Sequence, residues 1–200
     1  MYRNSINLIL NEIWPMLLIS TVIAVSIRTA YLIMHKKIFK LYRELIYLGM
    51  IVYVLSLFYI VTFQDVSWST SNFVPFKEIL RYNFGSSLFF KNVLGNMLIF
   101  MPFGLFISYI LKSKKIFPIT LITLITSITI ETTQLIIGRV FDIDDILLNV
   151  LGSLFGYYLF VLIEQIIPSK LKNEKVYNII LLLVIIFGII YLGGWLFWIR

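Results

Sequence analysis

Long apolar stretches separated by short polar connections dominate the chain. Six of these stretches reach the roughly 20 residues that a helix needs to cross the hydrocarbon core of a bilayer. They lie at about residues 14–34, 45–63, 93–111, 116–137, 146–167 and 177–198. The pattern predicts an all-α, polytopic membrane helical bundle of about six transmembrane helices, forming a single membrane domain over residues 1–200.

The basic residues alternate between connections and so predict the topology. Ten of the 17 Lys and Arg residues lie in the first, third and fifth connections, whereas the second and fourth carry four. Because cytoplasmic loops collect Lys and Arg, we expect both termini and the second and fourth connections to face outside. Only Arg3 precedes the first stretch and no small-residue cleavage pattern follows it, so we expect no cleaved signal peptide. The expected location is the cell membrane, with an extracytoplasmic functional face.

Composition agrees with this interpretation and narrows the classes of function. Hydrophobic residues make up 60% of the chain, the mean hydropathy is +0.95, and only 14% of residues are charged. The net charge of +7 is therefore a topology signal, and nucleic acid is excluded as the main partner. The chain has no cysteine, which removes disulfides and thiolate chemistry. Its one histidine, His35, falls in an inner connection, which disfavours histidine-dependent hydrolysis or zinc binding outside.

Glu131 is the least expected residue of the fourth apolar stretch. A carboxylate at the centre of a membrane helix costs about 2.5–3.5 kcal/mol, so it normally faces the bundle interior and meets a partner. Gln134 follows three residues later on the same face, nearer the outer surface. The pair indicates either a polar contact that joins helices or a functional site in the outer half of the bilayer.

The connection after Glu131 carries three acids and one arginine. Asp142 or Asp144 suits the N-cap of the next helix, where an acid also complements the helix dipole. Asp145 and Asn149 are four residues apart, so they share a helix face. Asn149 therefore places an amide group one helical turn deeper in the membrane. Arg139 precedes them and supplies a cation.

Two further elements are expected on the same side. Asn92 and Asn96 share a face at the start of the third apolar stretch. Within the long outer segment 64–91, residues 72–82 predict a short interfacial or re-entrant helix, whose Lys77 and Arg81 lie one turn apart. These two cations can hold a phosphate or contact ordinary anionic lipid. We expect a polar outer-leaflet pocket whose candidate ligand-binding residues are Lys77, Arg81, Asn92, Asn96, Glu131, Gln134, Arg139, Asp142, Asp145 and Asn149.

Residues 72–160 resemble the VanZ-like family of bacterial envelope proteins. The motif residues, in chain order, are Asn72, Pro75, Phe76, Asn92, Asn96, Pro102, Phe103, Gly104, Glu131, Gln134, Arg139, Asp142, Asp145, Asn149 and Gly152. The resemblance implies a polytopic cell-surface protein associated with lower susceptibility to membrane-anchored glycopeptides such as teicoplanin. It implies no settled enzymatic activity.

Three functions remain open from the sequence. The first is binding or remodelling of an outer-leaflet amphiphile: a lipid-linked cell-wall precursor, a teichoic-acid anchor or a lipoglycopeptide. The second is an intramembrane enzyme acting on a lipid or isoprenoid phosphate, with Glu131 or Asp145 as general acid or base. The third is a small proton-coupled carrier or flippase, which six helices would support better as a homo-oligomer. No cofactor is expected, although Asp142, Asp144 and Asp145 can hold a divalent ion together with a substrate phosphate.

Overall fold

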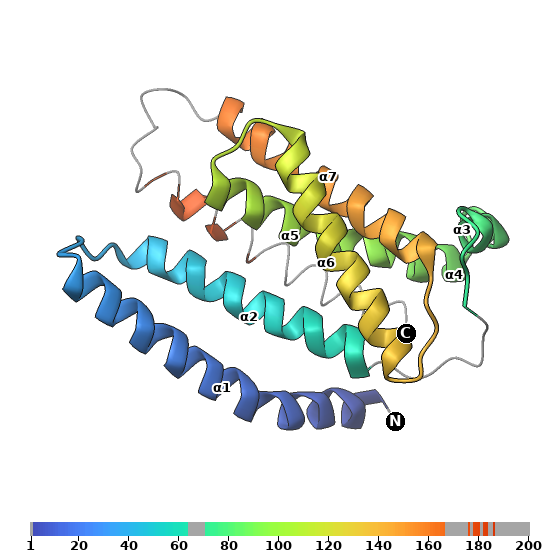
Figure 1. Ribbon diagram of the computed structural model, residues 1–200, viewed down its shortest axis with the longest axis horizontal. Helices are drawn as coiled ribbons and strands as arrows, with labels where there is room; N and C mark the ends of the chain where they lie inside the picture. The colour runs from blue at the N-terminus through green and yellow to red at the C-terminus, as the bar shows by residue number, and fades with distance from the viewer. Residues whose placement is uncertain are drawn as a thin grey trace. The chain divides into compact units, whose positions relative to one another are not determined.

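The computed structural model describes residues 2–63 and 71–166, together with residues 176, 178–180, 182–183 and 186 (Figure 1). All regular elements within this part of the chain are helices, accompanied by an isolated β-bridge between Asn72 and Asp142. The prediction of an all-α membrane protein is therefore confirmed. The chain divides into two compact units, Met1–Phe63 and Gln64–Arg200, which are described separately. The expected single domain over 1–200 stays a prediction.

The first unit is a helical hairpin of α1 (Tyr2–Met34) and α2 (Leu41–Phe63), which lie side by side (Figure 1). An ion pair joins the two helices: the guanidinium of Arg28 donates to both carboxylate oxygens of Glu44, at 2.7 and 3.1 Å. The Arg28 guanidinium also lies over the ring of Tyr47, 4.9 Å from its centre. Because both charges are satisfied within the hairpin, Arg28 serves helix packing.

The second unit begins with short helices and continues into three long ones. Its short elements are α3 (Lys77–Arg81), α4 (Ser87–Phe89) and the π-helix η1 (Phe90–Leu94). The long helices are α5 (Gly95–Leu111), α6 (Ile116–Ile136) and α7 (Ile143–Ile166), which lie together in Figure 1. The third predicted span therefore begins earlier than residue 93, since α4 and η1 run directly into α5.

Four helices within the described residues are long and apolar enough to cross a membrane. They cover Trp14–Met34, Ser87–Leu111, Ile116–Ile136 and Ile143–Ile166. The predicted stretch 45–63 is occupied by α2, and the predicted last stretch, 177–198, lies largely outside the described residues. The count of six spans and the outside position of the termini thus stay predictions.

Glycines let α5 and α7 pack with their backbones in contact. A Cβ atom added at Gly104 would lie 1.9 Å from the carbonyl oxygen of Ser153, and one at Gly152 would lie 2.0 Å from that of Met97. Small residues at such positions are how helices approach closely inside a membrane, where packing rather than water exclusion drives association. The contact fixes the register of α5 against α7, and so decides which of their polar side chains meet.

Candidate functional site

The loop before α7 pairs with the segment before α3. The backbone N–H of Asn72 donates to the carbonyl oxygen of Phe141 at 2.8 Å, and the N–H of Ile143 donates to that of Asn72 at 3.0 Å. The phenyl rings of Phe73 and Phe141 stack beside this bridge, with centres 5.2 Å apart. Residues about 70 positions apart in the sequence are thus held side by side, and the segment 71–81 lies against the first turn of α7.

Asp144 fastens this segment through four hydrogen bonds. Its carboxylate accepts the backbone N–H groups of Phe76 at 2.5 Å, Glu78 at 2.7 Å and Ile79 at 3.2 Å. The side-chain amide of Asn72 donates to it at 3.4 Å. Asp144 is only 1% exposed, and its position on α7 lets it cap the first turn of α3. The carboxylate therefore satisfies backbone donors that α3 cannot satisfy internally.

Glu131 is joined to the same network from α6. Its side chain is 2% exposed, and its Oε2 atom accepts the backbone N–H of Asp142 at 2.9 Å. The Oδ1 atom of Asp142 accepts the N–H of Asp144 and the amide of Asn72, each at 2.9 Å. Asp142 is thus the N-cap of α7, which confirms one of the two capping assignments expected from the sequence. The end of α6 and the start of α7 share one polar cluster.

Asp145 links this cluster to α5. The side-chain amide of Asn96 donates to the Oδ1 atom of Asp145 at 2.5 Å. Asn96 lies in the first turn of α5 and Asp145 in the first turn of α7, so the bond depends on the close register of these two helices. All three long helices of the second unit thus contribute to the cluster at the same end.

Two further hydrogen bonds join α6 and α7 deeper in the bundle. The amide of Asn149 donates to the hydroxyl of Ser127 at 2.9 Å, and the hydroxyls of Thr123 and Ser153 lie 2.7 Å apart. All four side chains are buried. On each helix, the two residues that make these contacts are four positions apart. They form two polar rows, one on α6 and one on α7, which lie on the same helix faces as Glu131 and Asp145. These contacts hold α6 in register with α7.

The carboxylates of the cluster interact electrostatically with one another. When ionised, Glu131 is repelled by Asp142 and Asp145. Asp145 is likewise repelled by Asp142 and Asp144. Arg139 is the cation that acts on both Glu131 and Asp145. Acidic side chains therefore outnumber the basic one, and the cluster is rich in hydrogen-bond acceptors. Chemically, it suits a group that donates hydrogen bonds, such as a hydroxyl or an ammonium.

Metal coordination is a separate question. Within the described residues, no three His, Asp or Glu side chains are placed so that they could hold a metal ion. The oxygens of Asp144 already accept backbone and amide donors. A divalent ion brought by a substrate phosphate stays an untested prediction.

Burial raises the pKa of the Asp142 carboxyl above its ordinary value, although the hydrogen bonds from Asn72 and from the N–H of Asp144 partly oppose this. The folded chain should therefore lose stability as the pH rises from about 4 through the raised pKa, because ionisation is harder in the folded than in the unfolded state. In Asp142→Asn, whose amide oxygen can accept the same two bonds, this dependence should be weaker. Melting temperatures of both proteins in detergent across that pH range measure it, and equal slopes would contradict it.

The structure brings together five of the ten candidate residues. Asn96, Glu131, Asp142, Asp145 and Asn149 all have hydrogen-bond partners within the cluster or in the polar rows beneath it. The four-residue spacing of Asp145 and Asn149 places these two on one face, whereas the other contacts depend on how the helices pack. Their role as ligand contacts stays a prediction.

The other five candidates lie around the cluster. Gln134 and Arg139 are half-buried near the end of α6, where the N–H of Arg139 donates to the carbonyl oxygen of Gln134 at 2.8 Å. Asn92 is half-buried in η1. Lys77 and Arg81 lie at the two ends of α3 and are exposed, and Arg81 pairs with Glu78 at 3.1 Å.

Three residues of the cluster and its polar rows are not among the ten ligand-binding candidates: Asn72, Asp144 and Ser127. The sequence predicts Asp144 as a cap for its own helix or as one of three ligands of a divalent ion, whereas the structure shows that it caps α3. The available signal for Asp144 is that it is a second acid, two residues after the N-cap acid Asp142. Its partners in α3, however, lie almost 70 residues earlier in the chain. Ser127 is four residues before Glu131 on the same face, and that spacing could have identified it.

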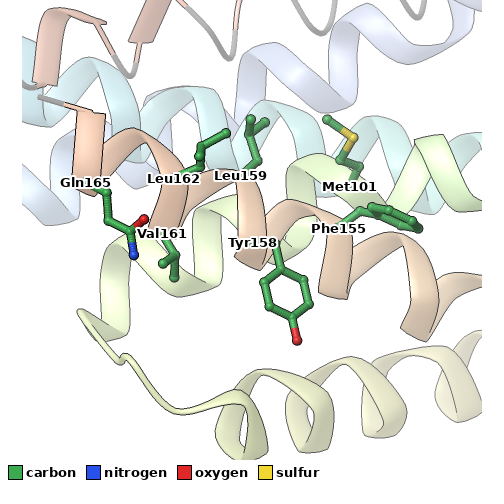
Figure 2. A pocket seen from close by; sticks show the side chains of 7 residues that line it. All are labelled: Met101, Phe155, Tyr158, Leu159, Val161, Leu162 and Gln165. Carbon is green, nitrogen blue, oxygen red and sulfur yellow. The ribbon is translucent and has the colours of Figure 1, made fainter.

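The groove in Figure 2 lies away from this cluster. Its volume is about 600 Å³, and one lining residue comes from α5 while the others come from α7. The lining side chains are Met101, Phe155, Tyr158, Leu159, Val161, Leu162 and Gln165. None of the candidate polar residues contributes to it, so this mainly apolar groove is distinct from the predicted polar pocket.

Comparisons with known proteins agree with the sequence resemblance. Residues 45–164 match the family described as VanZ/LLP1, a longer region than the 72–160 identified from the motifs. "Protein VanZ" of Enterococcus faecium is 30% identical over 104 residues, which are 51% of this chain and 63% of that protein. The chain thus spans somewhat less than two thirds of that relative. No solved structure matches. Because the family match covers more than half of its residues, the chain belongs to the VanZ/LLP1 family.

Proposed function

We propose that the polar cluster binds the headgroup of an amphiphile in the outer leaflet, and that this binding lowers susceptibility to teicoplanin-type lipoglycopeptides. The amphiphile is a lipid-linked cell-wall precursor, a teichoic-acid anchor or the lipoglycopeptide itself. Family membership supports the resistance association, and the positive-inside pattern supports an extracytoplasmic site.

One observation carries the proposal. Carboxylates and amides from three spanning helices are gathered at one end of the bundle, directly beside a segment with exposed cations. Ligands of this class carry hydroxyl or amino donors and, in the lipid-linked precursors, phosphate. Donors on the ligand suit Glu131 and Asp145, while Lys77, Arg81 and Arg139 suit the phosphate. A lipid tail would remain in the surrounding bilayer while the headgroup binds.

Susceptibility of a sensitive host that expresses the chain tests this function. We expect expression of the unaltered chain to lower teicoplanin susceptibility and the Glu131→Gln and Arg139→Ala variants to restore it. Loss of one charge-assisted hydrogen bond, about 1.5–3 kcal/mol, weakens binding roughly 10- to 150-fold. The amide oxygen of Glu131→Gln can still accept the N–H of Asp142, so this variant should fold.

Two controls make the result specific. Thr132→Ala changes the neighbouring, exposed residue of α6 and should behave like the unaltered chain. A glycopeptide without a lipid tail should show a much smaller effect, because it is not presented in the leaflet. Unchanged teicoplanin susceptibility in every well-expressed variant would overturn the proposal.

A further inference from the structure

Residues 73–90, which we call the arm, expose large apolar side chains along most of their length. Six large apolar side chains between residues 73 and 88 are more than half exposed, and Phe84 reaches 92%. Clusters of this kind on a protein surface mark contact with a partner or a membrane. The six side chains are Phe73, Val74, Phe76, Leu80, Phe84 and Leu88.

The position of the arm identifies a lipid leaflet as the partner. The last residues of the arm form the start of the span Ser87–Leu111, and Asp144 ties the arm to the first turn of the span Ile143–Ile166. Both spans therefore enter the hydrocarbon core within a few residues of the arm. A segment at that level lies where headgroups meet acyl chains.

Several backbone N–H groups of the arm have acceptors, as a position near hydrocarbon requires. Near hydrocarbon, an N–H group without an acceptor costs several kcal/mol. Asp144 accepts three backbone N–H groups of the arm, and Asn72 Oδ1 accepts that of Val74 at 3.1 Å. The two cations lie at the surface: Lys77 is exposed, and the Arg81 side chain is 68% exposed. This combination is typical of segments that contact anionic headgroups and bury apolar side chains beneath them.

The backbone conformation and the exposure of Phe76 also favour contact with lipid. Its backbone has a φ of 67°, in the left-handed region where a bulky residue is strained by about 1–3 kcal/mol. The Phe76 side chain is nevertheless 56% exposed, so contacts within the described protein recover only part of the apolar gain that burial would bring. Burial of the ring in lipid recovers the rest.

We propose that the arm inserts the side chains of Phe76, Leu80 and Phe84 into the acyl region of the adjoining leaflet, while Lys77 contacts lipid phosphates. Asp144 holds the arm at this depth against α7. The proposal concerns bulk lipid rather than the headgroup ligand of the polar cluster, and Lys77 is the residue that the two proposals share.

The absence of cysteine from the chain allows a direct test with single-cysteine spin labels. The full chain, carrying a nitroxide at Leu80→Cys or Phe84→Cys, is placed in vesicles of phosphatidylethanolamine and phosphatidylglycerol. Accessibility to oxygen, which enters lipid, is compared with accessibility to a water-soluble nickel chelate. Leu121→Cys on the exposed face of α6 provides the lipid reference, and Lys114→Cys in the α5–α6 connection provides the water reference.

We expect both arm labels to behave like Leu121→Cys, with nickel accessibility lost relative to Lys114→Cys. Nickel accessibility equal to that of Lys114→Cys would place the arm in water and overturn the proposal. Exclusion of both reagents would overturn it as well, because a protein surface would then cover the arm. Unchanged melting temperatures of the labelled variants verify that each one folds, and having two positions keeps the test decisive if one variant fails.

Discussion

Gly152→Ala should destabilise the chain by about 1–3 kcal/mol or more, a large effect for a single methyl group. The new Cβ atom would lie 2.0 Å from the carbonyl oxygen of Met97, 2.7 Å from its carbonyl carbon and 2.9 Å from its Cα atom. All three are backbone atoms, so no side chain can move aside, and α5 and α7 must separate. The melting temperature and the monodisperse fraction in detergent should both fall.

A second glycine offers a matched control. Gly49 lies within α2, and a Cβ atom there would meet nothing within 4 Å. Gly49→Ala should be neutral or stabilise by up to about 1 kcal/mol, since alanine favours the helix. If both substitutions leave the melting temperature unchanged, the backbone contact between α5 and α7 is not the determinant of stability that we infer.

Separation of α5 from α7 should also disturb the candidate site. The bond between Asn96 and Asp145 joins these two helices, so it is lost once they move apart by roughly 1 Å. We therefore expect Gly152→Ala protein that still folds to show reduced ligand binding at the polar cluster, although Gly152 lies further along α7 than the residues of the cluster.

Asp144→Ala should release the segment 71–81 from α7. The substitution leaves the backbone N–H groups of Phe76, Glu78 and Ile79 without their acceptor, and charge-assisted bonds of this kind contribute about 1.5–3 kcal/mol each. Asp144→Asn retains one acceptor oxygen and should have an intermediate effect. Amide hydrogen exchange of peptides covering residues 72–82 measures the release directly as faster exchange.

The control for this experiment lies in the same segment. Glu78→Gln weakens only an exposed ion pair with Arg81, worth roughly 0–1 kcal/mol, and should leave amide exchange nearly unchanged. Protection of residues 72–82 that survives in Asp144→Ala would show that the backbone bridge of Asn72 holds the segment without the carboxylate.

Helical spacing explains why part of the cluster could be predicted. Glu131 stands out within an apolar stretch, and the four-residue separation of Asp145 and Asn149 already places both on one face. The length of the apolar stretches also predicts α5, α6 and α7, because a helix that crosses the bilayer must be apolar over about 20 residues.

Partners that are distant in the sequence could not be predicted in the same way. The contacts of Asp144 with Phe76 and Glu78 join residues 68 and 66 positions apart, and no periodicity relates them. Likewise, Asn96 meets Asp145 only because Gly104 and Gly152 let α5 and α7 approach to backbone contact. The sequence contains these glycines, but it does not say which helix each one faces.

The sequence alone therefore determined the membrane class, the helical stretches of the second unit and the acidic and amide residues that stand on shared faces, because these depend on local hydropathy and helical spacing. The tertiary structure alone decided that Asp144 caps α3, that Asn96 binds Asp145 and that the arm exposes its apolar side chains. These features depend on the register between helices, and that register follows from backbone contacts over long sequence distances.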